Sequence, residues 1–164
     1  MKPQQNSESA TNEQFYEITP EQFAYDITLF ADFIFNSTSY EDKPRLYGVP
    51  RGGLIVAGYL AHLLKTEVIS CPLSSLKFYT GLGVIRPQDL IIEDIYDTGD
   101  TYKEIRKEVA TARVLHLYCK RRVPERFAGW PQAVRPLDLP RETFVRFPWE
   151  KIADDYTVQK HSLA

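Results

Sequence analysis

The sequence predicts an α/β protein with a single domain built on a mainly parallel β-sheet. Two observations support this prediction. Short apolar stretches alternate with segments of helical periodicity between residues 46 and 118, which is the order that produces parallel strands joined by helices. The chain has 164 residues and a hydrophobic content of 43%, enough to bury one such sheet but too little for two full domains.

The N-terminal part begins with polar residues and continues into a helix. Residues 1–13 offer no apolar face, so we expect a flexible tail there and a folded domain over residues 14–164. Thr19 and Pro20 supply a helix cap and a first-turn proline. Apolar residues then recur at helical spacing until a polar cluster at residues 36–39; they are Phe23, Ile27, Phe30, Phe33 and Ile34.

A strand, a glycine turn and a helix are expected next, at residues 46–49, 50–53 and 54–64. Residues 67–73 are apolar and β-branched enough for a second strand. Residues 74–88 are polar and contain glycine, which predicts a mobile loop or a hairpin.

The central strands follow. Residues 90–92 form a continuous apolar run, typical of a strand covered on both faces. The acidic segment 93–101 comes directly after it, and we expect a helix to about residue 112 and a strand at residues 114–118. Beyond residue 121, five prolines argue against long helices and favour loops with one short strand at residues 144–147.

Composition limits the possible partners. The formal net charge of -2 arises from 20 basic and 22 acidic residues, and it gives no reason to expect nucleic acid as a partner. Cys71 and Cys119 lie in apolar stretches without zinc-ligand spacing, so we interpret them as reduced and buried. The sequence shows no signal-peptide core and no apolar run of membrane-spanning length. We expect a cytoplasmic protein without integral membrane association.

The segment Ile91–Thr101 contains the most informative pattern, because it places three carboxylates beside a site suited to a phosphate. The carboxyl ends of parallel strands bind ligands, and the first amides of the next helix point toward them. Thr98, Gly99 and Thr101 suit a monophosphate. Glu93 and Asp94 suit two sugar hydroxyls, and Asp94 is also a candidate ligand for Mg²⁺. An acidic loop that only caps a helix is the alternative.

This pattern resembles the signature of the type I phosphoribosyltransferases, which bind phosphoribosyl pyrophosphate (PRPP). The resemblance extends over residues 18–150 and implies that family's fold, with a small C-terminal hood that binds the base. It implies that Glu93 and Asp94 bind the ribose, that the turn from Thr98 to Thr101 holds the 5′-phosphate, and that Asp97 is the catalytic residue near the base. Asp100 departs from the family, which often has glycine or lysine there, and its charge weakens phosphate binding unless the side chain points to solvent.

The segment 48–53 resembles the family's pyrophosphate loop. Gly52 and Gly53 let the main chain present amides to a diphosphate, and Arg51 supplies a positive charge. The resemblance also implies a cis peptide bond between Pro50 and Arg51. A plain glycine turn between a strand and a helix is the alternative interpretation.

Two further regions are interpreted from the resemblance. Residues 74–81 lie where the family has a loop that closes over PRPP, with Lys77 or Tyr79 as candidates to reach the pyrophosphate; a plain hairpin is the alternative. Lys120, Phe144 and Val145 resemble the base pocket of the bacterial xanthine-guanine branch of the family, although Lys120 also begins a basic run that suits solvent. The three histidines are scattered, and we interpret them as structural or surface residues.

The expected function is therefore the transfer of phosphoribose from PRPP to a 6-oxopurine with Mg²⁺ as cofactor, in a homodimer or homotetramer. Two alternatives remain open: a regulator that binds PRPP or a nucleotide without turnover, and an enzyme whose acceptor is a pyrimidine or another base.

Overall fold

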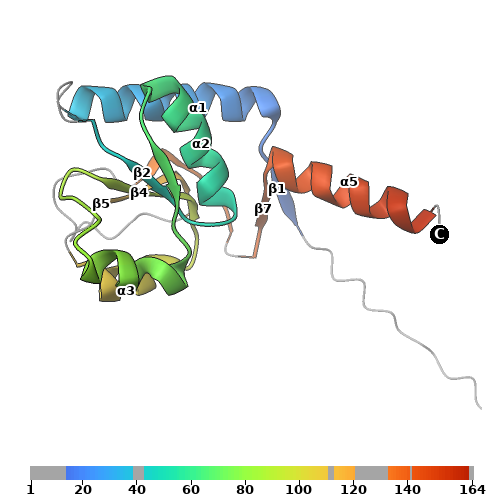
Figure 1. Ribbon diagram of the computed structural model, residues 1–164. Helices are drawn as coiled ribbons and strands as arrows, with labels where there is room; N and C mark the ends of the chain where they lie inside the picture. The colour runs from blue at the N-terminus through green and yellow to red at the C-terminus, as the bar shows by residue number, and fades with distance from the viewer. Residues whose placement is uncertain (1–13, 39–42, 111–112, 121–132, 141, 163–164) are drawn as a thin grey trace, which may run out of the picture. The chain divides into compact units, whose positions relative to one another are not determined.

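The computed structural model describes residues 14–38, 43–110, 113–120, 133–140 and 142–162 (Figure 1). The chain divides into two compact units. A core unit comprises Glu21–Leu139, and a terminal unit combines Met1–Pro20 with Pro140–Ala164. The tail predicted at residues 1–13 lies outside the described residues. The prediction of one domain over residues 14–164 stays a prediction.

A five-stranded sheet with the order β3-β2-β4-β5-β6 forms the centre of the core unit. Its strands are β2 (Leu46–Gly48), β3 (Val68–Ser70), β4 (Leu90–Tyr96), β5 (Arg113–Cys119) and β6 (Ala133–Pro136). Every neighbouring pair runs parallel. The α/β class with a parallel sheet is therefore confirmed, and β4 is longer than predicted because the ladder continues through the acidic residues.

Helices cover both faces of this sheet. Figure 1 shows α1 (Pro20–Ser37) and α2 (Gly52–Leu64) on one side of the strands and α3 (Leu73–Gly81) on the other. α4 (Asp100–Glu108) contributes Tyr102 and Ile105 to the same hydrophobic cluster that contains Leu76 of α3 and Ile91 of β4. These side chains are almost fully buried. Leu90, Ile91 and Ile92 are all fully buried, as expected of a strand that is covered on both faces.

The first helix begins at the proline that the sequence predicts. Phe23, Ile27, Phe30 and Ile34 are buried and Phe33 is half-buried, which confirms the predicted apolar face. Asp26 is buried on the same helix and accepts a hydrogen bond of 2.9 Å from the Tyr118 hydroxyl. The guanidinium of Arg135 lies 3.2 Å from the other carboxylate oxygen. This network links α1 to β5 and β6, because a buried carboxylate must be paired.

The loop or hairpin predicted over residues 74–88 is wrong in its first half, where the chain forms α3. Pro72 has an extended conformation and precedes the helix. Leu76 is fully buried, and the ring of Tyr79 lies edge-on to that of Tyr47 with centroids 6.1 Å apart. Serine and threonine make this a weak helix by local propensity, so tertiary contacts on its apolar side decide the conformation.

The terminal unit contains a two-stranded parallel sheet of β1 (Phe15–Glu17) and β7 (Phe144–Arg146). The rings of Phe15 and Phe144 meet edge-on with centroids 6.0 Å apart, and the Arg146 guanidinium lies 4.1 Å from the Phe15 ring centroid. The short strand predicted near residue 144 is confirmed, whereas β1 and β6 were not predicted.

The prolines predict no long helix beyond residue 121. This prediction is wrong at the C-terminal end, where α5 (Pro148–Ser162) has 15 residues. Pro148 occupies the first helical position, where its missing N–H costs no hydrogen bond. Glu150 accepts a hydrogen bond of 2.9 Å from the Phe147 amide. A proline therefore begins this helix instead of excluding it.

Both cysteines are free and buried, as predicted. Burial raises the pKa of the Cys71 thiol to about 11. The thiol therefore stays protonated at neutral pH and is a poor nucleophile. In the described part of the chain, no helix is long and apolar enough to cross a membrane.

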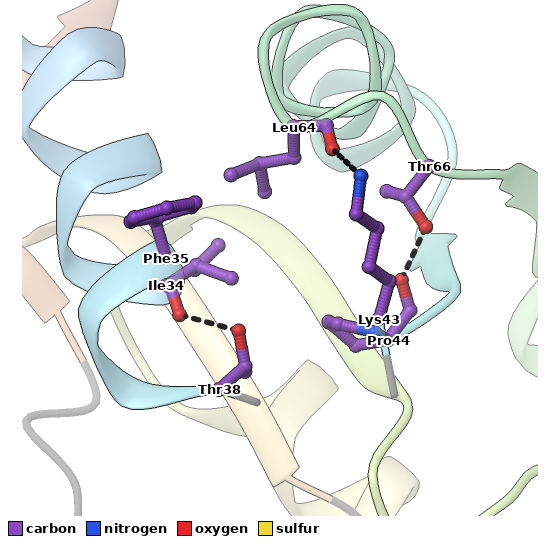
Figure 2. Close-up of a pocket in the computed structure, with 7 residues that line it drawn as sticks. All are labelled: Ile34, Phe35, Thr38, Lys43, Pro44, Leu64 and Thr66. Carbon is purple, nitrogen blue, oxygen red and sulfur yellow. Dashed lines mark hydrogen bonds between the residues drawn. The ribbon is translucent and has the colours of Figure 1, made fainter. Parts of the chain in front are cut away.

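A pocket lies between the C-terminal turns of α1 and α2 (Figure 2). Its lining includes Ile34, Phe35 and Leu64, with Lys43 at its edge. The Lys43 ammonium donates to the Leu64 carbonyl over 3.4 Å, and the Thr38 hydroxyl donates to the Ile34 carbonyl over 2.9 Å. The lining contains none of the site residues that the sequence predicts.

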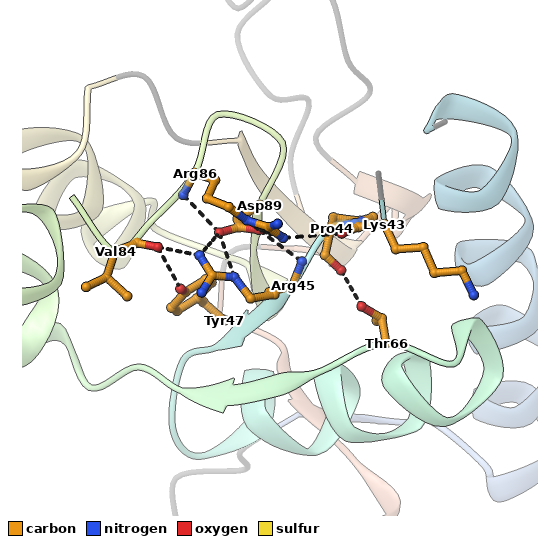
Figure 3. Close-up of polar contacts among 8 residues, drawn as sticks. All are labelled: Lys43, Pro44, Arg45, Tyr47, Thr66, Val84, Arg86 and Asp89. Carbon is orange, nitrogen blue, oxygen red and sulfur yellow. Dashed lines mark hydrogen bonds and ion pairs between the residues drawn. The ribbon is translucent and has the colours of Figure 1, made fainter. Parts of the chain in front are cut away.

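Asp89 joins the beginnings of β2 and β4 (Figure 3). Its side chain is fully buried and accepts hydrogen bonds of 2.7 Å from the Arg45 guanidinium and 2.8 Å from the Arg86 guanidinium. The Arg45 amide donates to it over 3.0 Å, and the Arg45 guanidinium also donates to the Val84 carbonyl. Burial alone would raise the pKa of Asp89, but the bonds from the two arginines outweigh it and hold the pKa below the usual range.

Replacing Asp89→Asn is expected to lower the free energy of unfolding by about 2–3 kcal/mol at pH 7, because both arginines lose a charged partner. The pKa in the folded state lies below the unfolded value of about 4, so the stabilisation is present above that pH and declines as the pH falls further. Urea denaturation between pH 3 and 7 measures the difference. The exposed Asp138→Asn is the control, and equal stability of the two variants at pH 7 would contradict the prediction.

Candidate active site at the carboxyl edge of the sheet

Two loops that the sequence singles out meet where β2 and β4 end. The Val49 amide donates to the Ile92 carbonyl over 3.0 Å. A Cβ atom on Gly53 would lie 2.4 Å from that same carbonyl oxygen, and a Cβ atom on Gly52 would lie 1.9 Å from Oδ2 of Asp94. At Gly53 only glycine permits this approach to backbone, and at Gly52 any side chain would displace the Asp94 carboxylate. The predicted pyrophosphate loop and the predicted ribose-binding carboxylate are therefore in direct contact.

The peptide bond between Pro50 and Arg51 is cis, as predicted. Arg51 precedes α2, and its side chain is exposed. Its guanidinium is therefore available to an anion at the N-terminus of this helix.

The turn after β4 leads directly into α4. Gly99 has a φ of 80° and precedes the first residue of the helix, a conformation that side chains other than glycine rarely adopt. A Cβ atom on Gly99 would also lie 2.5 Å from the Tyr96 hydroxyl. The amides of the first helical turn, including that of Thr101, form the type of N-terminus that binds a phosphate.

Asp100 points to solvent. This orientation is the condition under which its charge does not weaken phosphate binding. Its side chain is 74% exposed and lies 2.9 Å from the Lys103 ammonium. The Thr98 hydroxyl donates to its other oxygen over 2.8 Å. The bond from Lys103, followed by that from Thr98, lowers the pKa of Asp100 below its usual range. Lys103 therefore compensates the additional negative charge of this turn.

Asp97 and Lys120 form an ion pair at the ends of β4 and β5. The ammonium lies 3.1 Å from Oδ2 of Asp97, and the side chain of Lys120 is 4% exposed. The Lys120 amide donates to the Tyr96 carbonyl over 3.0 Å, which holds its backbone beside the turn. The structure thus brings together the predicted catalytic carboxylate and the predicted base-binding lysine. Lys120 itself is buried and not solvated, and its part in base binding stays a prediction.

Glu93 has a partner that the sequence interpretation missed. Nε2 of His116 lies 2.6 Å from Oε2 of Glu93, and the two residues are neighbours on β4 and β5. His116 is fully buried, whereas the Glu93 side chain is 10% exposed. The interpretation of His116 as structural did not include this contact. A histidine within the apolar run of β5 was a signal for it, because a buried imidazole requires a polar partner.

Four further residues were predicted to take part in the site. Phe144 is exposed and Val145 is buried, and both belong to β7 of the terminal unit. Their part in base binding stays a prediction. Lys77 is exposed and Tyr79 is half-buried on α3, and closure of this segment over a ligand also stays a prediction.

The carboxylates at this edge fit a magnesium ion that a substrate brings with it. No group of three or more potential metal-ligating side chains occurs among the described residues. Mg²⁺ in proteins is commonly held by one or two carboxylates together with substrate phosphates. Asp94 supplies such a carboxylate beside Gly52 of the predicted pyrophosphate loop.

Comparisons with known proteins identify similar sequences and similar folds. No family model matches the chain. The xanthine-guanine phosphoribosyltransferase of Idiomarina loihiensis is 27% identical over 122 residues, which are 67% of this chain and 73% of that protein. The solved xanthine-guanine-hypoxanthine phosphoribosyltransferase of Helicobacter pylori has a TM-score of 0.56 at 16% identity and covers 88% of this chain and 99% of its own. A Neisseria gonorrhoeae protein solved with bound ppGpp has a TM-score of 0.62 at 16% identity and covers 90% of this chain and 95% of its own.

The fold is that of a type I phosphoribosyltransferase. Within that class, the sequence is similar to the bacterial xanthine-guanine phosphoribosyltransferases.

Replacing Gly52→Ala is expected to lower the affinity for PRPP about tenfold or more, because the new Cβ displaces the Asp94 carboxylate from its position. The fold should be retained, since a side-chain end can move where backbone cannot. Calorimetric titration of PRPP with Mg²⁺ measures the affinity.

The matched control is Gly58→Ala, because Gly58 lies in α2 and a Cβ atom there meets nothing within 4 Å. This variant should bind PRPP normally and be up to about 1 kcal/mol more stable. Equal affinities of the two alanine variants would show that the contact between Gly52 and Asp94 has no role in binding.

Proposed function

We propose that this protein transfers the 5-phosphoribosyl group of PRPP to a 6-oxopurine (guanine, xanthine or hypoxanthine) and releases pyrophosphate, a reaction of purine salvage. The observation that supports this most strongly is the contact between Gly52 and Asp94. It brings the proposed diphosphate-binding loop and the proposed sugar-binding acidic pair to one edge of a parallel sheet, which suits a sugar that carries both phosphate and diphosphate. The similarity to curated xanthine-guanine phosphoribosyltransferases supports the same substrates.

Each group at this edge then has a part in binding. The first amides of α4 and the hydroxyl of Thr101 bind the 5′-phosphate. The Thr98 hydroxyl would join them by turning away from Asp100, to which it donates over 2.8 Å. Glu93 and Asp94 accept hydrogen bonds from the two ribose hydroxyls. The amides of Gly52 and Gly53, with the Arg51 guanidinium, bind the pyrophosphate. Bound Mg²⁺, for which Asp94 is the proposed ligand, would supply positive charge against the leaving pyrophosphate.

The reaction exchanges one bond at C1 of the ribose for another. The bond to the pyrophosphate oxygen breaks with its electron pair on the leaving group, and a bond forms to N9 of the purine. The purine proton that is lost passes to the Asp97 carboxylate. Lys120, held 3.1 Å from Asp97, donates a hydrogen bond to the 6-oxo group of the base. Positioning and electrostatics provide most of the rate enhancement, because the sugar cation requires no protein nucleophile.

A panel of bases tests this function directly. Pyrophosphate release is measured with PRPP, Mg²⁺ and each of guanine, xanthine, hypoxanthine, adenine, uracil and orotate. We expect release with at least one 6-oxopurine and none with the pyrimidines. Activity only with a pyrimidine or adenine would overturn the choice of acceptor while leaving the reaction type in place.

A nucleotide-binding regulator is a second candidate, because one neighbour in fold was solved with bound ppGpp. Calorimetry with PRPP and with ppGpp separates the two functions. A regulator would bind one of these ligands and release no pyrophosphate with any base. A cytoplasmic location and a homodimeric or homotetrameric state remain part of the proposal, and sedimentation of the purified chain measures the latter.

Replacing Asp97→Asn is expected to reduce kcat about 100-fold or more, because the variant loses its proton acceptor and leaves Lys120 without the carboxylate at 3.1 Å. PRPP affinity should change less than threefold, since the phosphate and ribose groups remain. Steady-state kinetics and PRPP calorimetry measure the two quantities. Unchanged turnover would remove Asp97 from the mechanism.

A further inference from the structure

The pair of Glu93 and His116 is buried at the point where β4 enters the candidate active site. The residue before Glu93 bonds through its carbonyl to Val49, and the residue after it contacts Gly52. The backbone of Glu93 itself is close to the pyrophosphate loop, because a Cβ atom on Gly53 would lie 2.9 Å from its Cα. The carboxylate therefore belongs to the same edge of the sheet as the two loops.

His116 is held in place by aromatic rings. Its ring lies edge-on to that of Tyr96, with centroids 5.3 Å apart, and 6.1 Å from that of Tyr102. The Arg106 guanidinium donates to the Tyr102 hydroxyl over 2.7 Å and lies 5.1 Å from the ring centroid. Tyr102 and Arg106 belong to α4. The imidazole is consequently packed against the helix whose N-terminus is the proposed phosphate site.

The bond to His116 engages one of the two carboxylate oxygens of Glu93, Oε2. A carboxylate in this environment needs a partner, because burial removes the water that would otherwise solvate it. Nε2 lies 2.6 Å from Oε2, a short distance for a hydrogen bond to a carboxylate oxygen. A glutamate side chain has several rotatable bonds, and this contact restricts them. The carboxylate has a second oxygen, Oε1, and the side chain retains 10% exposure.

We propose that His116 is a positioning residue for PRPP binding. It binds Oε2 of Glu93 and thereby orients Oε1 toward a ribose hydroxyl, so that the carboxylate is ordered before the substrate arrives. This inference rests on the proposed function, because it takes Glu93 as a ribose ligand. It goes beyond that function by assigning a role to a residue of β5 that has no direct contact with substrate.

Three substitutions at this position separate orientation from packing. His116→Leu removes the donor and retains much of the apolar volume. His116→Gln keeps a donor near the position of Nε2, whereas His116→Asn keeps a polar side chain that is too short to reach Glu93. His62→Leu is the control, since His62 is an exposed histidine of α2. Thermal melts of all four variants report on the fold.

We expect the Leu and Asn variants to raise the KM for PRPP about tenfold, the effect of losing one hydrogen bond to a charged group, while the KM for the purine stays within twofold. The Gln variant should recover most of the PRPP affinity, and His62→Leu should match the wild type. A residue that served packing alone would lower the melting temperature without this division between the two substrates and without rescue by Gln.

Calorimetry measures PRPP affinity without turnover. The role of His116 can therefore be tested whether or not the proposed reaction occurs. Wild-type chain that binds PRPP but releases no pyrophosphate refutes the proposed reaction, and a weaker PRPP affinity of the Leu and Asn variants still supports the role of His116. If the wild type and the Leu and Asn variants bind PRPP with equal affinity, the proposed role of His116 is overturned. A wild type that binds no PRPP overturns both proposals. If the Leu variant does not fold, the comparison of Gln with Asn decides.

Discussion

Close approach of the glycine loop to β4 is the constraint on which the candidate site depends: Gly53 lies against the backbone of β4, and Gly52 lies against the Asp94 side chain. Parallel pairing of β2 with β4 brings the ends of both strands to one edge, but the loop after β2 contacts β4 only because two residues lack a Cβ. The contact places Asp94 against the loop that precedes α2. At the opposite ends of these two strands, Asp89 forms ion pairs with Arg45 and Arg86. These ion pairs help to hold β2 and β4 in register.

Pairing of charges is the second feature of this edge. Three acidic residues at this edge each pair with a different basic side chain. Glu93 pairs with His116, Asp97 with Lys120, and Asp100 with Lys103. Without these partners the carboxylates would repel one another and a bound anion. The pairs instead hold the acceptors and donors in fixed positions before any ligand is present, which is the arrangement that favours electrostatic stabilisation of a charged reaction centre.

The parts of the structure that could be predicted are those with strong local patterns. The apolar run before Glu93, the glycine turn before α2 and the proline that begins α1 each have one favourable local conformation. The errors at residues 74–81 and 148–162 have a common cause. The local helix propensities of serine, threonine and proline do not decide the conformation where tertiary contacts are available. Leu76 is buried in the core although its neighbours are polar, and Pro148 begins a helix that its presence was expected to exclude.

The sequence alone determined the α/β class, the acidic turn and the glycine loop, because each depends on residues that are adjacent in the chain. The cis bond between Pro50 and Arg51 was expected only from the family resemblance. The tertiary structure decided which distant residues meet. His116 lies 23 positions after Glu93 and Lys120 lies 23 positions after Asp97, and only the register of β4 with β5 makes them neighbours. Side-chain pairing between strands has no local signature, since it follows from the alignment of whole ladders and not from the propensity of either residue.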